Sequence, residues 1–233
     1  MTGYKLMIAA VVAGLGAAAG AAGPDNPYGG GTRLHGPPPA EIPTGGAMTA
    51  RDKARLVTMR FAACMIKAHR TAVLKVIEPE PWQDGADRKL VRIVDEQCLE
   101  EGELSMPTNL LRGALYQVLY REKFPSAPPP LPATPIDFTA GERASLSEEA
   151  RTEVALRQFG DCVARRDAQN AHALIVSAPG SNKETAAINA LAPHFSPCVI
   201  QGAKWTLDRA SVTAILSEVL YREGIAAAPR AGD

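Results

Sequence analysis

Two stretches of this chain repeat one pattern, and this repetition constrains the fold more than any other feature of the sequence. The pentapeptide VLYRE at residues 118–122 recurs unchanged at 219–223. Upstream, both copies carry a phenylalanine three residues before a cysteine, and later a second cysteine four residues before a glycine. Matched positions lie 98 to 101 residues apart, so the landmarks keep their order and spacing. Such self-similarity indicates one structural unit present twice.

Apolar residues in both copies follow the spacing of helices. Leu90, Val94 and Cys98 recur every four residues, which places them on one helix face. The last predicted helix of each copy carries a matching apolar face, formed by Leu111, Leu115, Val118 and Leu119 and by Val212, Leu216, Val219 and Leu220. The sequence offers no alternating strand pattern beside a tight turn, so no β-hairpin is expected. We therefore predict an all-α protein with two homologous, disulfide-stapled units of three to four helices each, joined by a proline-rich spacer.

The second copy differs from the first in its middle helix, which contains Pro193 and Pro197. Proline lacks a backbone N–H, and its ring clashes with the preceding helical turn. We therefore predict that this helix is broken at the prolines.

Four cysteines lie inside the repeats, and four cysteines allow three pairings. A unit copied as a whole carries its own bond, so we predict the pairs Cys64–Cys98 and Cys162–Cys198. A loop of this size contributes about 3–4 kcal/mol to stability in the chain-entropy model. The alternative is a metal site at Cys64 with His69, or at His194 with Cys198. Neither pair recurs in the other copy or fits a common zinc finger, so we predict no metal site.

The N-terminus has the organisation of a secretory signal. Lys5 precedes an unbroken apolar or small stretch at 6–22, and Ala19 and Ala21 suit the −3 and −1 positions of a cleavage site. The alternative is an uncleaved membrane anchor, although the stretch is short and rich in weakly hydrophobic Ala and Gly. We predict export to the periplasm or the medium, with no stable membrane span after cleavage.

Proline clusters separate the repeats from the rest of the chain. Six prolines fall between 23 and 47 and six more between 125 and 135, where neither helix nor strand is expected to propagate. The predicted organisation is a signal peptide (1–22), a disordered tether (23–47), repeat 1 (48–124), a proline-rich linker (125–143), repeat 2 (144–226) and a flexible tail (227–233).

Composition and motifs exclude several classes of function. The net charge is zero, whereas a nucleic-acid binder normally carries a basic surface, so no nucleic-acid partner is predicted. The sequence contains no Gly-x-Ser-x-Gly, no His-Glu-x-x-His and no phosphate-binding loop. Nothing in the sequence calls for a cofactor, and we assign no catalytic residue.

The repeated Tyr-Arg-Glu is the sharpest candidate for a contact site. Tyr120 and Tyr221 could touch a partner, with Arg121 and Arg222 binding its acidic groups. The alternative is structural: tyrosine completes the apolar helix face, and arginine favours the C-terminal end of the helix. Trp82 lies in a proline-rich turn of the first copy, where it could be an exposed anchor or a lid over that unit.

The second copy also resembles a group of known sequences. The residues that carry the resemblance are Phe159-Gly-Asp-Cys-Val, Ser177-Ala-Pro-Gly-Ser, Leu191-Ala-Pro-His-Phe-Ser-Pro-Cys and Leu220-Tyr-Arg. They are similar to uncharacterised exported proteins of alphaproteobacteria. The first copy lacks the Pro-Gly-Ser and Pro193 elements. The resemblance implies an exported, helical repeat architecture and no particular activity.

These observations favour a non-enzymatic exported module that binds a protein or an envelope component, with one weak site on each unit acting across the spacer. One alternative is an envelope-acting enzyme with a site between the copies, for which a cleft containing His172 or His194 with carboxylates would argue. The other is a carrier of small ligands with an apolar cavity between helices. The pattern leaves open the oligomeric state and whether the two units touch.

Overall fold

The computed structural model describes residues 31–35, 48–83, 85–99, 103–139, 141, 144–200 and 205–228. The predicted signal peptide, most of the predicted tether and the end of the predicted tail lie outside this range. Most of the described chain is helical, as predicted. The elements are, in chain order, β1 (Gly31–His35), α1 (Ala50–Ile77), α2 (Ala86–Arg92), the short 3-10 helix η1 (Glu96–Cys98), β2 (Glu103–Pro107), α3 (Thr108–Lys123), α4 (Glu148–Arg166), α5 (Ala168–Val176), α6 (Asn182–Cys198) and α7 (Arg209–Ala227).

A two-stranded antiparallel ribbon departs from the all-α prediction. Strand β1 pairs with β2 in a register that runs from Gly31 opposite Pro107 to His35 opposite Glu103. The segment of β1 was expected to form no regular structure. The sequence signal of a hairpin is a tight turn between adjacent strands. Here α1, α2 and η1 separate the two strands in the chain, so no such turn exists between them.

The prediction that the middle helix of the second copy is broken at its prolines is also wrong, because α6 continues through Pro193 and Pro197. Both prolines are exposed, whereas Leu191 and Cys198 occupy the buried face of the same helix. Water can therefore reach the carbonyls that lose their helical donors. The buried face and a disulfide at Cys198 hold the last turns in place.

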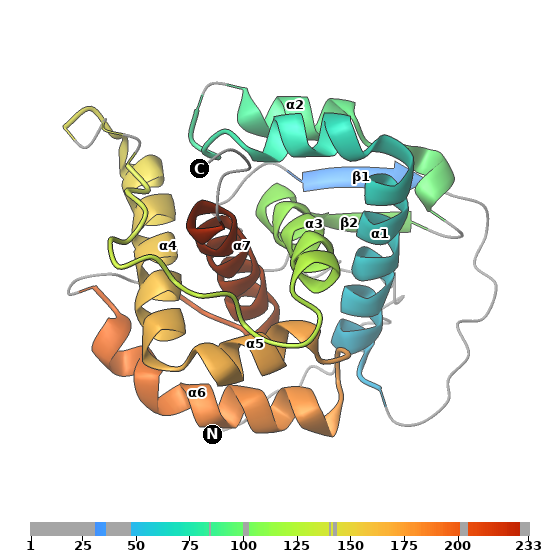
Figure 1. Cartoon of the computed structure of the whole chain (residues 1–233). Coiled ribbons are helices and arrows are strands. Elements are labelled where there is room, and N and C mark those ends of the chain that lie inside the picture. The colour runs from blue at the N-terminus through green and yellow to red at the C-terminus, as the bar shows by residue number, and fades with distance from the viewer. Residues whose placement is uncertain are drawn as a thin grey trace, which may run out of the picture.

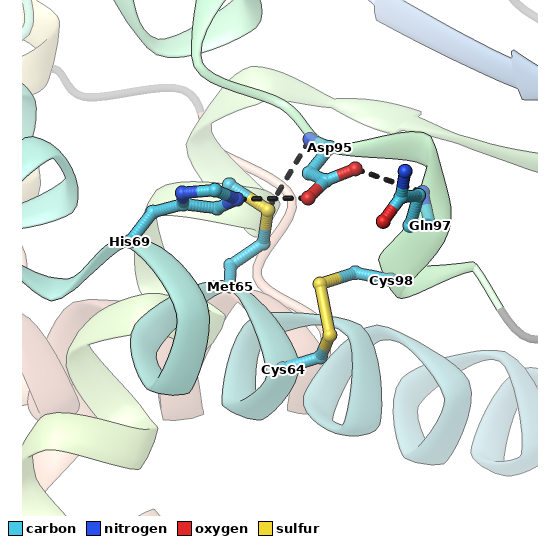
Figure 2. The surroundings of a disulfide bond; sticks show 6 residues. All are labelled: Cys64, Met65, His69, Asp95, Gln97 and Cys98. Atoms are coloured by element: carbon cyan, nitrogen blue, oxygen red, sulfur yellow. Dashed lines mark hydrogen bonds and ion pairs between the residues drawn. A yellow bond between two sulfur atoms is a disulfide. The ribbon is translucent and has the colours of Figure 1, made fainter.

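Both predicted disulfides are present. Cys64 bonds to Cys98 and Cys162 bonds to Cys198, with Cα–Cα distances of 5.5 and 5.6 Å. The bonds enclose 34 and 36 residues of sequence separation. Figure 2 shows the first bond joining α1 to η1, beside a hydrogen bond between His69 and Asp95. We call residues 48–124 the first half and residues 144–228 the second half. Each disulfide therefore ties a long helix to the segment that precedes the last helix of the same half.

The long first helix is interrupted at matching places in the two halves. In α1, His69 has non-helical backbone angles (φ −132°, ψ 33°). In the second half, Asp167 separates α4 from α5 (φ −152°, ψ 74°) and caps α5 by accepting from the backbone N–H of Asn170. Each interruption follows the first cysteine of its half by five residues. Buried apolar residues follow each interruption, including Val73 and Ile77 in the first half and Leu174 and Ile175 in the second.

The two halves pack directly against each other. Figure 1 shows α3 and α7 side by side at the centre, with α1 beside α3 and α4 beside α7. Tyr120 of α3 belongs to the apolar core of the second half, and Tyr221 of α7 packs against the core of the first. The last helix of each half thus contributes to the core of the other.

The proline-rich segment after α3 does not hold the halves apart. Phe138 is only 1% exposed and packs with Leu146, Val154 and Val219 in a third apolar cluster. The backbone N–H of Ile136 donates to Glu223 on α7 at 3.1 Å. Arg165 on α4 donates to the carbonyl of Pro132 at 2.8 Å. This segment, residues 125–139, is therefore a strap along the second half rather than a spacer.

Candidate ligand-binding cleft

Helices α3 and α7 approach each other closely at Gly113 and Ala214. A Cβ atom at Gly113 would lie 2.2 Å from the Cβ and 2.8 Å from the Cα of Ala214, so only glycine fits there. The two residues are equivalent when the repeated pentapeptides are aligned. A contact between equivalent residues is what an approximate two-fold axis produces in an isologous interface.

The repeated tyrosines lie inside this junction. Tyr120 is 0% exposed, and its hydroxyl lies 2.9 Å from Nδ1 of His172. Burial raises the pKa of the Tyr120 phenol above its usual value. Tyr221 is partly buried, and its ring centroid lies 5.7 Å from that of Tyr116 on α3. Tyr120 is therefore inaccessible to an external partner in this structure.

The repeated arginines also reach across the junction. Arg121 donates to the carbonyls of Ile175 and Ser177 at the end of α5, at 2.7 and 2.6 Å. Arg222 forms a two-pronged ion pair with Glu80 in the first half, at 3.0 and 2.5 Å. The side chain of each arginine thus contacts the opposite half, and Arg121 also lies in the last turn of its own helix.

Trp82 makes a further contact between the halves. The guanidinium of Arg157 on α4 lies 5.6 Å from the centre of the Trp82 ring. The ring packs against the apolar cluster that contains Phe138. Trp82 is therefore neither an exposed anchor nor a lid over its own unit, and all five predicted contact residues contribute to the junction.

A buried carboxylate lies among three arginines at the same junction. Glu218 on α7 pairs with Arg157 at 2.8 Å and with Arg112 and Arg222 at 3.5 Å each. Burial alone would raise the pKa of Glu218, but the surrounding arginines outweigh it and lower the pKa to about 2. Such a network is destabilising to break, because the remaining charges would be buried without partners.

A cleft of about 730 Å³ opens on the α1 side of the α3–α7 crossing. It lies between the first turns of α1, α3 and α7 and strand β2, so both halves line it. Its surface is mainly apolar, and the apolar lining includes Met59, Leu104, Met106, Leu110 and Ala114. Its size falls within the range of about 300–1,000 Å³ that is typical of ligand sites. We refer to it as the junction cleft.

On the α4 side of the crossing the corresponding space is much smaller, at about 280 Å³. Trp205 lines this second space, whereas the equivalent position in the first half is Leu104, which lines the junction cleft. Arg157 and Glu218 of the buried ion network occupy its wall. The larger indole and the paired charges explain why this side of the junction is less open than the other.

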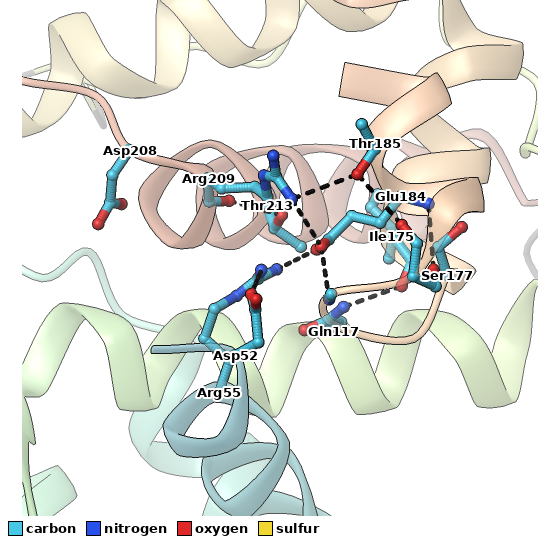
Figure 3. A network of polar contacts seen from close by, with 12 residues as sticks. Asp52, Arg55, Gln117, Ile175, Ser177, Glu184, Thr185, Asp208, Arg209 and Thr213 are labelled. Atoms are coloured by element: carbon cyan, nitrogen blue, oxygen red, sulfur yellow. Dashed lines mark hydrogen bonds and ion pairs between the residues drawn. The ribbon is translucent and has the colours of Figure 1, made fainter. Parts of the chain in front are cut away.

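An ion cluster around Glu184, shown in Figure 3, borders the junction cleft, because its residues Arg55 and Arg209 are among the lining residues. Glu184, in the first turn of α6, is 1% exposed and accepts from the guanidinium of Arg55 and, at 2.8 Å, from the backbone N–H of Gly180. Arg209 of α7 lies 3.6 Å from the second oxygen of Glu184. Arg55 belongs to the first half and Arg209 to the second. Glu184 therefore positions one arginine from each half at the cleft.

The charged groups around the cleft differ in how much of their hydrogen-bonding capacity is already used within the protein. Asp208 accepts from the backbone N–H and the hydroxyl of Ser211, both at 2.8 Å. Asp52 accepts from the hydroxyl of Thr49 at 2.7 Å and from Arg55 at 3.4 Å. By contrast, the side chain of Arg209 is 38% exposed, and its distances to Thr185 and Glu184 are long, at 3.5 and 3.6 Å. Arg209 therefore still has N–H groups that can donate hydrogen bonds to a ligand.

The histidines offer no catalytic arrangement at this cleft. Neither His172 nor His194 is among its lining residues, so the arrangement that would argue for an enzyme does not occur there. Burial lowers the pKa of His172, and its imidazole is engaged by Tyr120. His69 pairs instead with Asp95 beside the first disulfide, and this hydrogen bond lowers the pKa of Asp95.

Metal-binding and membrane-spanning features are both absent from the described residues. No three His, Cys, Asp or Glu side chains in that part of the chain gather closely enough to hold a metal ion. None of the described helices combines the length and the apolar character needed to cross a membrane.

Three residues of the ion cluster, Arg55, Glu184 and Arg209, were not among the site residues predicted from the sequence, and two of them, Arg55 and Arg209, line the cleft. One signal was available, since Ser181 and Glu184 have the spacing of a capping box, and Ser181 does accept from the backbone N–H of Glu184 at 3.1 Å. That spacing predicts a helix start but not the burial of the carboxylate. The burial results from the tertiary placement of α6 beside α1 and α7, which no local pattern encodes.

The chain was compared with known proteins, and no protein-family model, no curated protein and no solved structure matches it.

Proposed function

We propose that this chain is a non-enzymatic, exported binding protein made of two homologous helical units fused into one body, and that the junction cleft is its ligand site. The single observation that carries this proposal is a cleft of about 730 Å³ with a mainly apolar lining to which both halves contribute. Two disulfides fit an oxidising environment outside the cytoplasm.

Several features support descent of the two halves from one unit. The disulfides join equivalent cysteines, the helical interruptions at His69 and Asp167 are equivalent, and α3 and α7 cross at equivalent residues. In this proposal the present chain is a covalent form of a symmetric dimer. Substitutions on one side, including Trp205 in place of leucine, filled one of two equivalent spaces and left the other open.

One shared site accounts for the structure better than two separate weak sites acting across a spacer. Helices α3 and α7 pack against each other and hydrogen bonds cross between the halves, so the units have no freedom to engage two distant sites. The residues predicted to form those sites are used at the junction. A single shared site is the simpler arrangement. It corresponds to the alternative of a small-ligand carrier with an apolar cavity between helices, to which charged residues at the cleft are added.

The proposal can be tested with N-phenyl-1-naphthylamine, an uncharged probe whose fluorescence increases in apolar sites. We expect saturable binding to the wild-type protein. Ala54 is exposed and lines the cleft, so Ala54→Trp fills the cleft without disturbing the core. Ala127 is exposed in the strap and is absent from the cleft lining, so Ala127→Trp is the matched control.

The expected result is a loss of probe affinity of at least tenfold in Ala54→Trp, with wild-type affinity in Ala127→Trp. Circular dichroism of both variants confirms that they are folded. Equal probe affinity in the two variants, or no saturable binding to the wild type, would overturn the assignment of the cleft.

A further inference from the structure

We infer that the ligand of the junction cleft is a linear amphiphile with a carboxylate head, such as a medium-chain fatty acid. This inference rests on the proposed function and adds the chemical class of the ligand. The apolar tail would lie along the floor of the cleft, and the head would bind Arg209. Among the described residues of the ion cluster, Arg209 combines exposure with unused hydrogen-bond donors.

The tail site follows from the lining of the cleft. Met59 of α1, Leu104 and Met106 of β2 and Leu110 and Ala114 of α3 present apolar side chains to one space. Contact with an aliphatic chain removes this apolar surface from water, at roughly 25 cal/mol per Å² of apolar area. Methionine adapts to flexible apolar ligands, because its side chain is unbranched and polarisable. The floor therefore suits a flexible chain better than a rigid polar molecule.

The head site follows from the ion cluster that borders the cleft. Glu184 is held by Arg55 and by the backbone N–H of Gly180, so its charge is compensated without a close contact to Arg209. Arg209 keeps a planar set of N–H donors that matches the two oxygens of a carboxylate. It also lies in the first turn of α7, where the helix dipole favours an anion.

The acidic groups around the cleft are poorly placed to hold a cationic head. Asp52 already accepts from the Thr49 hydroxyl and from Arg55, and Asp208 accepts from the backbone N–H and the hydroxyl of Ser211. Glu184 is buried. A cation would have to compete with these contacts and would approach Arg51, which is exposed on the cleft rim. Three arginines and two aspartates line the cleft, and the neighbouring Glu184 offsets the remaining positive charge. The preference for an anion therefore comes from which groups retain free hydrogen-bonding capacity.

The test is displacement of N-phenyl-1-naphthylamine by three ligands with one tail: decanoate, 1-decanol and decyltrimethylammonium, all below their aggregation limits. We expect decanoate to displace the probe at a concentration at least tenfold lower than the other two. Arg209→Gln should abolish most of this preference, and Arg209→Lys should retain part of it. Arg151 is exposed on α4 and absent from the cleft lining, so Arg151→Gln is the matched control and should keep the preference.

The outcomes separate the inference from the proposed function. Equal displacement by the three ligands, or an unchanged preference in Arg209→Gln, overturns the carboxylate head. In that case the cleft assignment stands if the probe still binds in a manner sensitive to Ala54→Trp. No probe binding, together with no heat of decanoate binding in calorimetry, overturns both proposals.

Discussion

The close approach of Gly113 to Ala214 gives the sharpest test of how the halves are joined. A Cβ atom at position 113 would lie 2.2 Å from the Cβ of Ala214, whereas carbon atoms pack best at about 3.5–4.0 Å. In Gly113→Ala, helices α3 and α7 must therefore separate by more than about 1 Å. Overpacking of this kind costs about 1–3 kcal/mol.

The same substitution has an opposing effect, because alanine is favoured over glycine within a helix by about 0.5–1 kcal/mol. The net expectation is destabilisation by about 1–2 kcal/mol, or a decrease in Tm of about 2–8 °C for a chain of this size. Urea unfolding followed by circular dichroism measures the change, with the m-value as a check on two-state behaviour.

The reciprocal change separates packing from helix propensity. Ala214→Gly alone should destabilise by about 0.5–1 kcal/mol, since it only removes a favourable residue from α7. When combined with Gly113→Ala, it should instead restore stability, because it removes the methyl group that clashes. The recovery should be incomplete, because the new methyl group would still lie 2.8 Å from the backbone carbon of residue 214. Additive effects of the two changes, or a stabilised Gly113→Ala variant, would refute a tight crossing at these residues.

Three further predictions concern the stability of the junction and the halves. Replacing Cys162 and Cys198 by alanine should lower the free energy of unfolding by about 2–5 kcal/mol in equilibrium denaturation, and an unchanged value would argue against a closed bond in the native protein. Glu218→Gln should cost about 3–5 kcal/mol at neutral pH by leaving buried arginines underpaired. The pKa of Glu218 is lowered from 4.5 to about 2, so its ionised form stabilises the fold above pH 4.5 and this contribution is lost toward pH 2. The difference in the free energy of unfolding between Glu218→Gln and the wild type should therefore become smaller from pH 4.5 toward pH 2. A difference that does not change with pH would contradict the ion network. Burial lowers the pKa of His172, so the unfolded chain binds its proton more readily and stability should fall as pH drops below 6.5. In thermal melts taken between pH 7.5 and 5, His172→Phe should reduce the dependence of Tm on pH. A Tm profile unchanged from the wild type would contradict this role of His172.

Features that local patterns and the repeat both encode could be predicted correctly from the sequence. The cysteine pairing followed from the duplication, and helical content followed from the apolar spacing around residues such as Leu115 and Leu216. The single helix face predicted through Leu90, Val94 and Cys98 was wrong, because α2 ends at Arg92 and Cys98 lies in the separate helix η1. Pro193 and Pro197 were misleading, because helix breaking depends on whether the freed carbonyls can reach water. Their exposure on the outer face of α6 is a tertiary property.

For the repeated Tyr-Arg residues the sequence left two interpretations open, contact with an external partner or a structural role within the helices. A repeated, polar and aromatic motif has the composition of a contact surface, and the motif does make contacts, but between the two halves of one chain. Sequence alone does not distinguish an internal partner from an external one. The cleft was also beyond prediction, since Arg55, Glu184 and Arg209 come from three helices that meet only in the folded protein.

The central claim is that the two halves form one body through the α3–α7 junction, and cutting the strap tests it directly. Ser126 and Ala127 are exposed, so a specific protease site can be placed there. Both disulfides lie within single halves, so no covalent bond joins the halves after cleavage. Size-exclusion chromatography of the cleaved protein under native conditions should give one species containing both fragments in equal amounts, with the elution volume of the intact chain. Elution as two separate fragments would contradict the account.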